Sequence, residues 1–107
     1  MRIMLKSKIQ RVIVTEANVD YEGSISIDER LMREADILPY EQVHVLCLDN
    51  GARLETYAIP GNLGEISIKG AAARLIRTGD TIIILSYEYM NETQALNCNP
   101  KILNYSK

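Results

Sequence analysis

Short segments of apolar or alternating residues, separated by turn-forming residues, constrain the fold of this chain more than any other feature. Alternation of apolar and polar residues is typical of a half-buried β-strand. Six such segments occur, at residues 9–14, 24–27, 42–48, 53–59, 65–69 and 81–89. A chain of 107 residues has room for a single hydrophobic core. Six short strands around one core favour a closed β-barrel, because closure leaves no strand edge exposed.

We therefore expect a mainly β fold, a small six-stranded barrel with short helices that spans residues 1–107 as one domain. The segment 42–48 is apolar on both faces, as expected for a strand in a closed barrel or at a subunit contact. Asn50-Gly51 follows it and predicts the tight turn of a hairpin, because both residues tolerate left-handed backbone angles.

Two short helices are expected between the strands. Asp28 can cap a helix that runs to Ala35. Pro39 would end it, since proline disfavours helical geometry in the residue before it. Gly70 would open the second helix, over residues 71–76.

The core and the tail follow from composition. The chain contains no Trp and no Phe, so Ile, Leu, Val and Tyr are expected to fill the core. From residue 91 onward the sequence is polar and irregular. This pattern predicts a tail that is mobile or depends on a partner.

The charge balance and the cysteines exclude several classes of partner. A net charge of −2 and a pI near 5.4 provide no basic field for nucleic acid. The longest apolar run, residues 82–85, is far too short to span a bilayer, and early charges do not fit a signal peptide. Cys47 and Cys98 lack metal-ligand spacing and are typical of a reducing compartment. We expect a cytoplasmic protein with no nucleic-acid, membrane or metal partner.

The dipeptide Gly23-Ser24 carries the chemical hypothesis. A Ser hydroxyl can attack the preceding carbonyl when that residue is Gly, because no Cβ obstructs the approach. The peptide bond becomes an ester, and β-elimination followed by hydrolysis leaves a chain that begins with a pyruvoyl group. Ser24 would thus become a ketone, an electron sink that no ordinary side chain supplies. The alternative is an ordinary turn between strands, where Gly-Ser is common.

Four separated blocks follow one another in the order of a known family. The blocks are Met4-Leu5-Lys6-Ser7-Lys8-Ile9, Tyr21-Glu22-Gly23-Ser24, Asn50-Gly51 with Arg53 and Thr56-Tyr57, and Gly70-Ala71-Ala72-Ala73. Over nearly all of its length the chain resembles the pyruvoyl-dependent aspartate 1-decarboxylases. The resemblance implies a double-psi β-barrel that assembles as a homotetramer and cleaves itself into a β chain (1–23) and an α chain (24–107). It implies the conversion of L-aspartate to β-alanine and CO2, for pantothenate biosynthesis. The cofactor would be a covalent pyruvoyl group formed from Ser24, with no metal and no pyridoxal phosphate.

The resemblance also implies roles for individual residues. After cleavage at Gly23, Ser24 would carry the carbonyl that forms a Schiff base with the substrate amine. Tyr57 would then protonate the carbon that loses CO2. Thr56 would donate to the Gly23 carbonyl during cleavage and later contact the substrate. Because neighbours on a strand point to opposite faces, Thr56 and Tyr57 can serve one site only if a twist or bulge lies there.

Two kinds of group are candidates to bind the substrate carboxylates. Arg53 offers a planar fork that suits a carboxylate, and Lys8 offers a second cation. Backbone N–H groups of Gly70, Ala71 and Ala72, at a helix start, offer a further cradle. Each also has an ordinary explanation, as a solvated charge or as a small residue chosen for packing.

Two positions depart from the family pattern. Lys69 stands where the family usually has Asn before Gly-Ala-Ala, which bears on self-cleavage and on substrate choice. If Lys69 faces the site, its cation should bind a carboxylate or perturb Tyr57; otherwise it is an outward charge. Gln10 replaces a His that relatives often carry. His44 has no Ser or Cys partner nearby, and we interpret it as structural.

Three functions therefore compete. A self-processing aspartate decarboxylase is favoured. The second is the same machinery acting on another amino diacid, which Lys69 allows. The third is a non-catalytic β-barrel interaction module, in which Gly23-Ser24 is an ordinary turn. An accessory protein that triggers maturation stays open as a partner of the first two.

Overall fold

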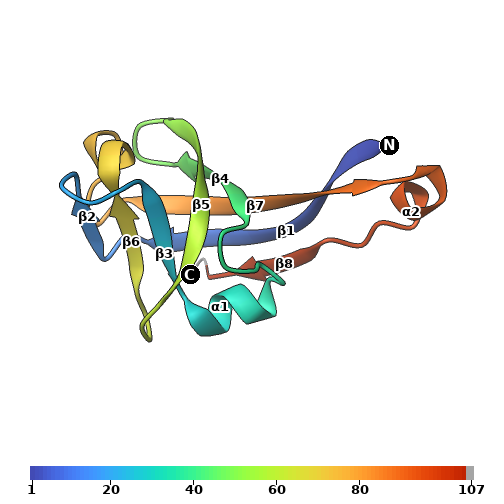
Figure 1. Ribbon diagram of the computed structural model, residues 1–107, viewed down its shortest axis with the longest axis horizontal. Coiled ribbons are helices and arrows are strands. Elements are labelled where there is room, and N and C mark those ends of the chain that lie inside the picture. The colour runs from blue at the N-terminus through green and yellow to red at the C-terminus, as the bar shows by residue number, and fades with distance from the viewer. Residues whose placement is uncertain (106–107) are drawn as a thin grey trace.

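A computed structural model describes residues 1–105 of the chain and shows a mainly β fold (Figure 1). Its strands are β1 (Arg2–Ile13), β2 (Glu16–Asn18), β3 (Ser24–Asp28), β4 (Gln42–Cys47), β5 (Arg53–Gly61), β6 (Ile66–Lys69), β7 (Thr81–Met90) and β8 (Lys101–Asn104). Its helical elements are α1 (Glu29–Glu34), the 3₁₀ helix η1 (Gly70–Arg74) and α2 (Glu92–Leu96). The mainly β prediction is confirmed, and the described residues add the short strands β2 and β8 to the six predicted ones.

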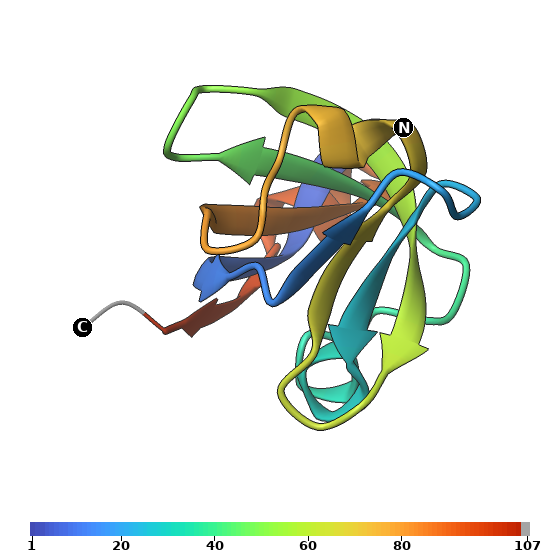
Figure 2. The ribbon, with the colours of Figure 1, turned by 90° about the vertical axis from the view of Figure 1, so that its left-hand side faces the viewer.

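The strands form one sheet in the order β2-β6-β3-β5-β4-β7-β1-β8, which curls into a small barrel (Figure 2). The first two strands close it, because β1 pairs with β7 while β2, which follows directly, pairs with β6. In the link between them, the backbone N–H of Thr15 donates to the carbonyl of Ile66 at 2.8 Å. The predicted small-barrel architecture is confirmed.

β1 and β7 are longer than the body of the barrel and project from it as a two-stranded arm (Figure 1). β1 begins at Arg2, well before the predicted start at residue 9, and its pairing with β7 contains two register shifts. Arg11 lies in the second of these and has a positive φ of 63°. Such irregularities interrupt the alternation of a strand. Periodicity therefore found only the half of β1 that enters the core.

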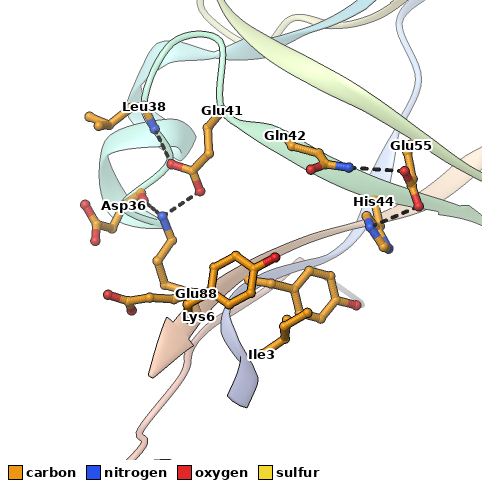
Figure 3. Close-up of a pocket in the computed structure, with 11 residues that line it drawn as sticks. Ile3, Lys6, Asp36, Leu38, Glu41, Gln42, His44, Glu55 and Glu88 are labelled. Atoms are coloured by element: carbon orange, nitrogen blue, oxygen red, sulfur yellow. Dashed lines mark hydrogen bonds and ion pairs between the residues drawn. The ribbon is translucent and has the colours of Figure 1, made fainter. Parts of the chain in front are cut away.

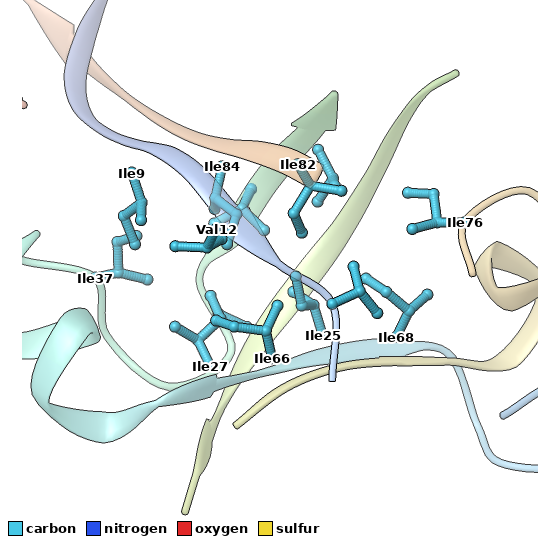
Figure 4. Packing of buried hydrophobic residues seen from close by; sticks show 14 of the residues in the cluster. Ile9, Val12, Ile25, Ile27, Ile37, Ile66, Ile68, Ile76, Ile82 and Ile84 are labelled. Carbon is cyan, nitrogen blue, oxygen red and sulfur yellow. The ribbon is translucent and has the colours of Figure 1, made fainter. Parts of the chain in front are cut away.

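The core is built from Ile and Val (Figure 4). Its fully buried large side chains include Ile9, Ile25, Ile27, Ile68, Ile76, Ile82, Ile84, Val14, Val43 and Val45. β-Branched residues pack well on the pleated surface of strands, so this composition suits a barrel. The prediction that Tyr would also fill the core is wrong, because Tyr21, Tyr40 and Tyr89 are exposed. Aromatic side chains instead lie on the outer surface.

α1 ends earlier than proline rules predict. The last helical residue is Glu34, and Asp36 adopts a left-handed φ of 57°. The backbone N–H of Ile37 then donates a hydrogen bond to the carbonyl oxygen of Met32 at 2.8 Å, which is the pattern of a Schellman motif at a helix C-terminus. The chain has left the helix before Pro39, so the prediction that Pro39 ends it is wrong.

Residues 91–105 contain a helix and a strand, in contrast to the irregular tail that the sequence predicts. α2 starts with a reciprocal cap in which the side chains of Asn91 and Gln94 each accept a backbone N–H of the other residue. β8 then pairs in parallel with β1. Residues 106–107, the end of the predicted tail, lie outside the described residues. No helix within residues 1–105 has the length and apolar character needed to cross a membrane.

The predicted hairpin and second helix are both present. β4 and β5 are antiparallel neighbours joined through Asn50-Gly51, and Gly51 has a φ of 74°. The second helix is a 3₁₀ turn that begins at Gly70, one residue before the predicted range. It follows directly after β6, which places the start of this helix beside the strand that pairs with β3.

Asp28 ties the start of α1 to the loop between β5 and β6. Its carboxylate accepts the backbone N–H of Arg30 at 2.8 Å and that of Gly64 at 2.7 Å. The residue is only 3% exposed. The Gly64 N–H and, next, the Arg30 guanidinium lower the pKa of Asp28 from 3.8 to about 2. Because the folded pKa lies below the unfolded one, the ionised carboxylate stabilises the fold above about pH 4 and loses this effect as the pH falls toward 2.

We expect Asp28→Asn to lower the urea midpoint of unfolding at pH 7, because an amide cannot replace the ionised acceptor. The difference from the wild-type protein should narrow as the pH falls from about 4 toward 2, where the wild-type carboxyl also becomes neutral. Urea unfolding followed by circular dichroism at several pH values measures this. Asp20→Asn, at an exposed carboxylate, is the control. A difference that stays constant over the acid range would contradict the role of the charge.

Candidate active site

The bond between Gly23 and Ser24 lies where the chain enters the barrel. Gly23 is exposed, whereas Ser24 begins β3 and is only 4% exposed. Ser24 pairs with Lys69 on the antiparallel strand β6, so the sheet holds its backbone. Ser24 is thus a strand residue, and the reactive-bond hypothesis concerns a buried serine that follows an exposed glycine.

Gly70 packs directly against Gly23. A Cβ placed on Gly70 would lie 2.7 Å from the Cα of Gly23, 2.8 Å from its N and 3.1 Å from the carbonyl oxygen of Tyr21. Gly70 also has a φ of 79°, a region that favours glycine. Two separate constraints therefore require glycine at position 70. This contact holds the loop before Ser24 against the start of η1.

A cavity of about 300 Å³ opens beside this contact. Its wall consists of Gly23, Leu54, Glu55, Thr56, Lys69, Ala71, Ala72 and Leu75. Five of these were predicted as site residues from the sequence, and two more, Ser24 and Gly70, are their immediate neighbours in the chain. The volume is at the small end of the range for ligand sites, which suits a molecule of amino-acid size.

Lys69 belongs to this wall, as the site-facing hypothesis requires. Its ammonium lies 5.5 Å from the centroid of the Tyr21 ring, within the range of a cation–π contact. Its charge also reaches Glu65. The backbone N–H of Asn62 and the hydroxyl of Ser67 hold the pKa of Glu65 below its ordinary value, and the Lys69 charge adds to this. Lys69 is therefore more than an outward charge.

Thr56 and Tyr57 lie on opposite faces of β5. Thr56 lines the cavity, whereas the Tyr57 ring stacks on Tyr40 with the ring centroids 6.1 Å apart. The pairing of β5 with β4 continues through both residues without a register shift. The predicted twist or bulge at Thr56-Tyr57 is therefore wrong. The strand alternates regularly, so Tyr57 is not part of the wall that Thr56 belongs to.

Lys8, Arg53 and Tyr57 share the face of the sheet that is opposite to Thr56. Arg53, Glu55 and Tyr57 alternate with the inward residues of β5, so they project on one side, and of these three only Glu55 also borders the cavity. Glu55 pairs across the sheet with a residue of β4, and the same row continues over β7 to Lys8 on β1. The predicted site residues thus form two groups, one around Gly23 and one on this outer face. The two groups lie on opposite faces of the sheet, so they do not meet within one chain.

A larger groove of about 620 Å³ also borders this outer face (Figure 3). Several of its polar side chains pair with one another. The Lys6 ammonium lies 2.6 Å from the Glu41 carboxylate, and His44 Nε2 lies 3.6 Å from Glu55. The His44 ring also packs edge-on against Tyr87, with centroids 4.9 Å apart. These contacts explain His44 as a packing residue, and the predicted site residues lie outside the groove.

Sequence reasoning missed three residues of the cavity wall, Leu54, Glu55 and Leu75. Leu54 carried a usable signal, since it shares a face with Thr56 by the two-residue period of a strand. Leu75 follows η1 and reaches the cavity only through the fold.

Within residues 1–105, no three His, Cys, Asp or Glu side chains come together as a metal site. Cys47 and Cys98 are both free thiols.

Comparison with known proteins gives a consistent picture. The family model described as aspartate decarboxylase matches residues 1–107. The chain is 57% identical over 104 residues to the aspartate 1-decarboxylase of Thermoanaerobacter pseudethanolicus, covering 95% of this chain and 89% of that protein. It is 52% identical to that of Dehalococcoides mccartyi (94% and 82% covered) and 50% identical to that of Campylobacter hominis (94% and 89%). The chain therefore belongs to the aspartate decarboxylase family.

Proposed function

We propose that this protein decarboxylates L-aspartate to β-alanine and CO2, as a step of pantothenate biosynthesis, after cleaving its own chain between Gly23 and Ser24. Cleavage leaves a β chain of residues 1–23 and an α chain of residues 24–107. The observation that carries the proposal is the cavity in which Gly23 meets Thr56 and the Ala-rich start of η1, in a member of this family.

The junction suits an attack by Ser24 Oγ on the carbonyl carbon of Gly23. Gly23 has no Cβ to obstruct that approach. The contact with Gly70 restrains one side of the bond and the pairing of Ser24 with β6 restrains the other, so little freedom is lost on reaching the reactive geometry. We assign Thr56, in the same cavity wall, to donate to the Gly23 carbonyl oxygen as negative charge develops on it.

The surroundings of Ser24 fit a covalent pyruvoyl group. Ser24 is buried, and no side chain separates the Gly23 loop from η1, because Gly70 fills that contact. When formed, the group supplies a sink for the electron pair that remains when CO2 leaves the substrate. Ala71 and Ala72 line the cavity, and we assign their backbone N–H groups to contact the substrate.

We assign the second half of the site to a neighbouring chain. Lys8, Arg53 and Tyr57 lie on the face opposite to Thr56, so one chain cannot bring them to Ser24. In a homotetramer, this face of one chain would cover the cavity of another. Arg53 and Lys8 then bind the substrate carboxylates, and the Tyr57 phenol donates the proton to the carbon that loses CO2.

Mixing two inactive variants tests the shared site. Ser24→Ala lacks the reacting residue, and Tyr57→Phe, which should still cleave itself, lacks the proton donor. In hybrids formed on co-expression of equal amounts, each site takes Ser24 from one chain and Tyr57 from its neighbour, and each of these residues is native in half of the chains. About a quarter of the sites then have both residues native, so about a quarter of the wild-type rate of β-alanine formation from aspartate is expected. Each variant alone should show only background, and light scattering should show a tetramer. Hybrids no more active than their parts, or an active monomer, would contradict the shared site.

A second substrate stays under consideration because Lys69 adds a cation to the cavity wall. Comparing the rates of CO2 release from aspartate and from glutamate separates the two amino diacids.

The third hypothesis, a non-catalytic interaction module, is disfavoured by the burial of Ser24 in β3. We further propose that the protein acts in the cytoplasm, in keeping with its two free thiols. Cleavage of the purified protein without added factors would make a maturation factor unnecessary.

A further inference from the structure

Lys69 and Tyr21 meet across the bond that the proposed function breaks. Tyr21 precedes Gly23 and stays with the β chain, whereas Lys69 lies in the α chain. The Lys69 ammonium is 5.5 Å from the centroid of the Tyr21 ring. The Lys69 carbonyl oxygen is 4.0 Å from the position that a Cβ on Gly23 would take, and both residues line the same cavity. The loop that ends at Gly23 therefore rests on Lys69 from two sides.

The Lys69 ammonium has no ion-pair partner within residues 1–105. Glu65 feels its charge, but the Glu65 carboxylate is already engaged, by the Asn62 N–H at 2.9 Å and the Ser67 hydroxyl at 2.7 Å. A cation held over an aromatic ring keeps N–H donors free for an anion. The uncleaved chain thus presents an unpaired cation beside Gly23.

Cleavage creates an anion at this place. In the ester, the carbonyl carbon of Gly23 is bonded to the Ser24 Oγ, its bond to the Ser24 nitrogen is broken, and the hydroxyl proton has moved to the amine that this frees on residue 24. Elimination removes the proton from the Cα of residue 24 and breaks its Cβ–Oγ bond, and the electron pair of that bond leaves with the oxygen. Gly23 becomes a terminal carboxylate that contains this oxygen. Water then hydrolyses the new α-chain end, with release of ammonia, to the ketone.

We propose that Lys69 binds the carboxylate that cleavage creates at Gly23, and so holds the end of the β chain in place after the bond is broken. The inference rests on the proposed self-cleavage. Such binding would serve the reaction, because an unpaired carboxylate at the entrance of the site would repel a substrate that carries two carboxylates. Other charged groups on the neighbouring elements are Glu16, Asp20, Glu22, Asp28, Arg53, Glu55, Glu65 and Arg74. Acidic groups predominate among them, which makes the Lys69 cation the one in the cavity wall that can offset the new charge.

Carbon NMR of protein labelled with ¹³C at glycine carbonyls tests this binding without using enzyme activity. The chain has six glycines, and only a cleaved chain has a glycine carboxyl that titrates. In the wild-type protein the pKa of this carboxyl should lie below the ordinary range of about 3.3–3.7 for a chain terminus. In Lys69→Gln the pKa should be about one pH unit higher, since the opposite charge is gone.

Two variants complete the experiment. Lys69→Arg keeps the cation and should titrate like the wild-type protein, while Lys101→Gln, at an exposed lysine of β8, should also leave the pKa unchanged. A titrating carboxyl with the same pKa in the wild type and in Lys69→Gln would overturn the inference and leave self-cleavage intact. Absence of any titrating glycine carboxyl in the wild-type protein would instead refute the self-cleavage on which it rests.

Discussion

Ser24→Ala should leave one full-length chain of 12.1 kDa where the wild-type protein yields two fragments, and it should abolish β-alanine formation. The Ala side chain has no oxygen to attack the Gly23 carbonyl, so neither the ester nor the ketone can form. Ser24 is buried in β3, and removal of one oxygen atom changes the packing little. Intact-mass measurement of the purified protein checks the chain, and an assay with aspartate checks the activity.

Ser26→Ala provides a matched control for this substitution. Ser26 lies two residues further along β3 and is buried to a similar degree, but it does not follow a glycine. We expect Ser26→Ala to cleave itself as the wild-type protein does. If Ser24→Ala still divided after residue 23, the ester mechanism would be wrong and an external protease would explain the fragments.

Gly70→Ala should have a comparably large effect, on both folding and self-cleavage. Its methyl group would lie 2.7 Å from the Cα of Gly23, and Ala would also have to adopt a φ of 79°. The left-handed backbone costs about 1–2 kcal/mol and the overpacking about 1–3 kcal/mol of folding stability. The loop can relieve the clash by moving Gly23 away from η1, which would disturb the approach of Ser24. Cleavage should therefore slow strongly even in protein that remains folded.

Gly64→Ala separates the two causes. Gly64 has a φ of 78°, almost the same as Gly70, but a Cβ there would meet nothing within 4 Å. We expect this variant to lose only the backbone contribution and to cleave at the wild-type rate. Denaturant unfolding gives the stabilities, and a time course on a denaturing gel gives the cleavage rates. Equal cleavage rates in Gly70→Ala and Gly64→Ala would contradict a role for the contact with Gly23.

Much of the candidate site could be predicted from the sequence because its signals are local. Gly23-Ser24 marks the bond that is proposed to break through the chemistry of two adjacent residues. Gly70 opens a helix through a backbone angle that glycine adopts without strain. The strands were found where alternation holds, as in β3 and β6, and were missed or shortened where it fails. The register shifts of β1 and the four residues of β8 leave too little periodic pattern to detect.

The sequence by itself determined a small β-barrel, a family and the bond that is proposed to break, since each depends on residue types and their order. Only the tertiary structure decided which of these residues meet. The pairing of β6 with β3 places Lys69 beside Ser24, and the start of η1 places Gly70 in contact with Gly23. Regular alternation on β5 sends Thr56 into the cavity and Tyr57 to the opposite face. The physical reason is that the direction of a side chain depends on the register between strands. Pairing across the barrel sets that register, and residues far apart in the chain make the pairing.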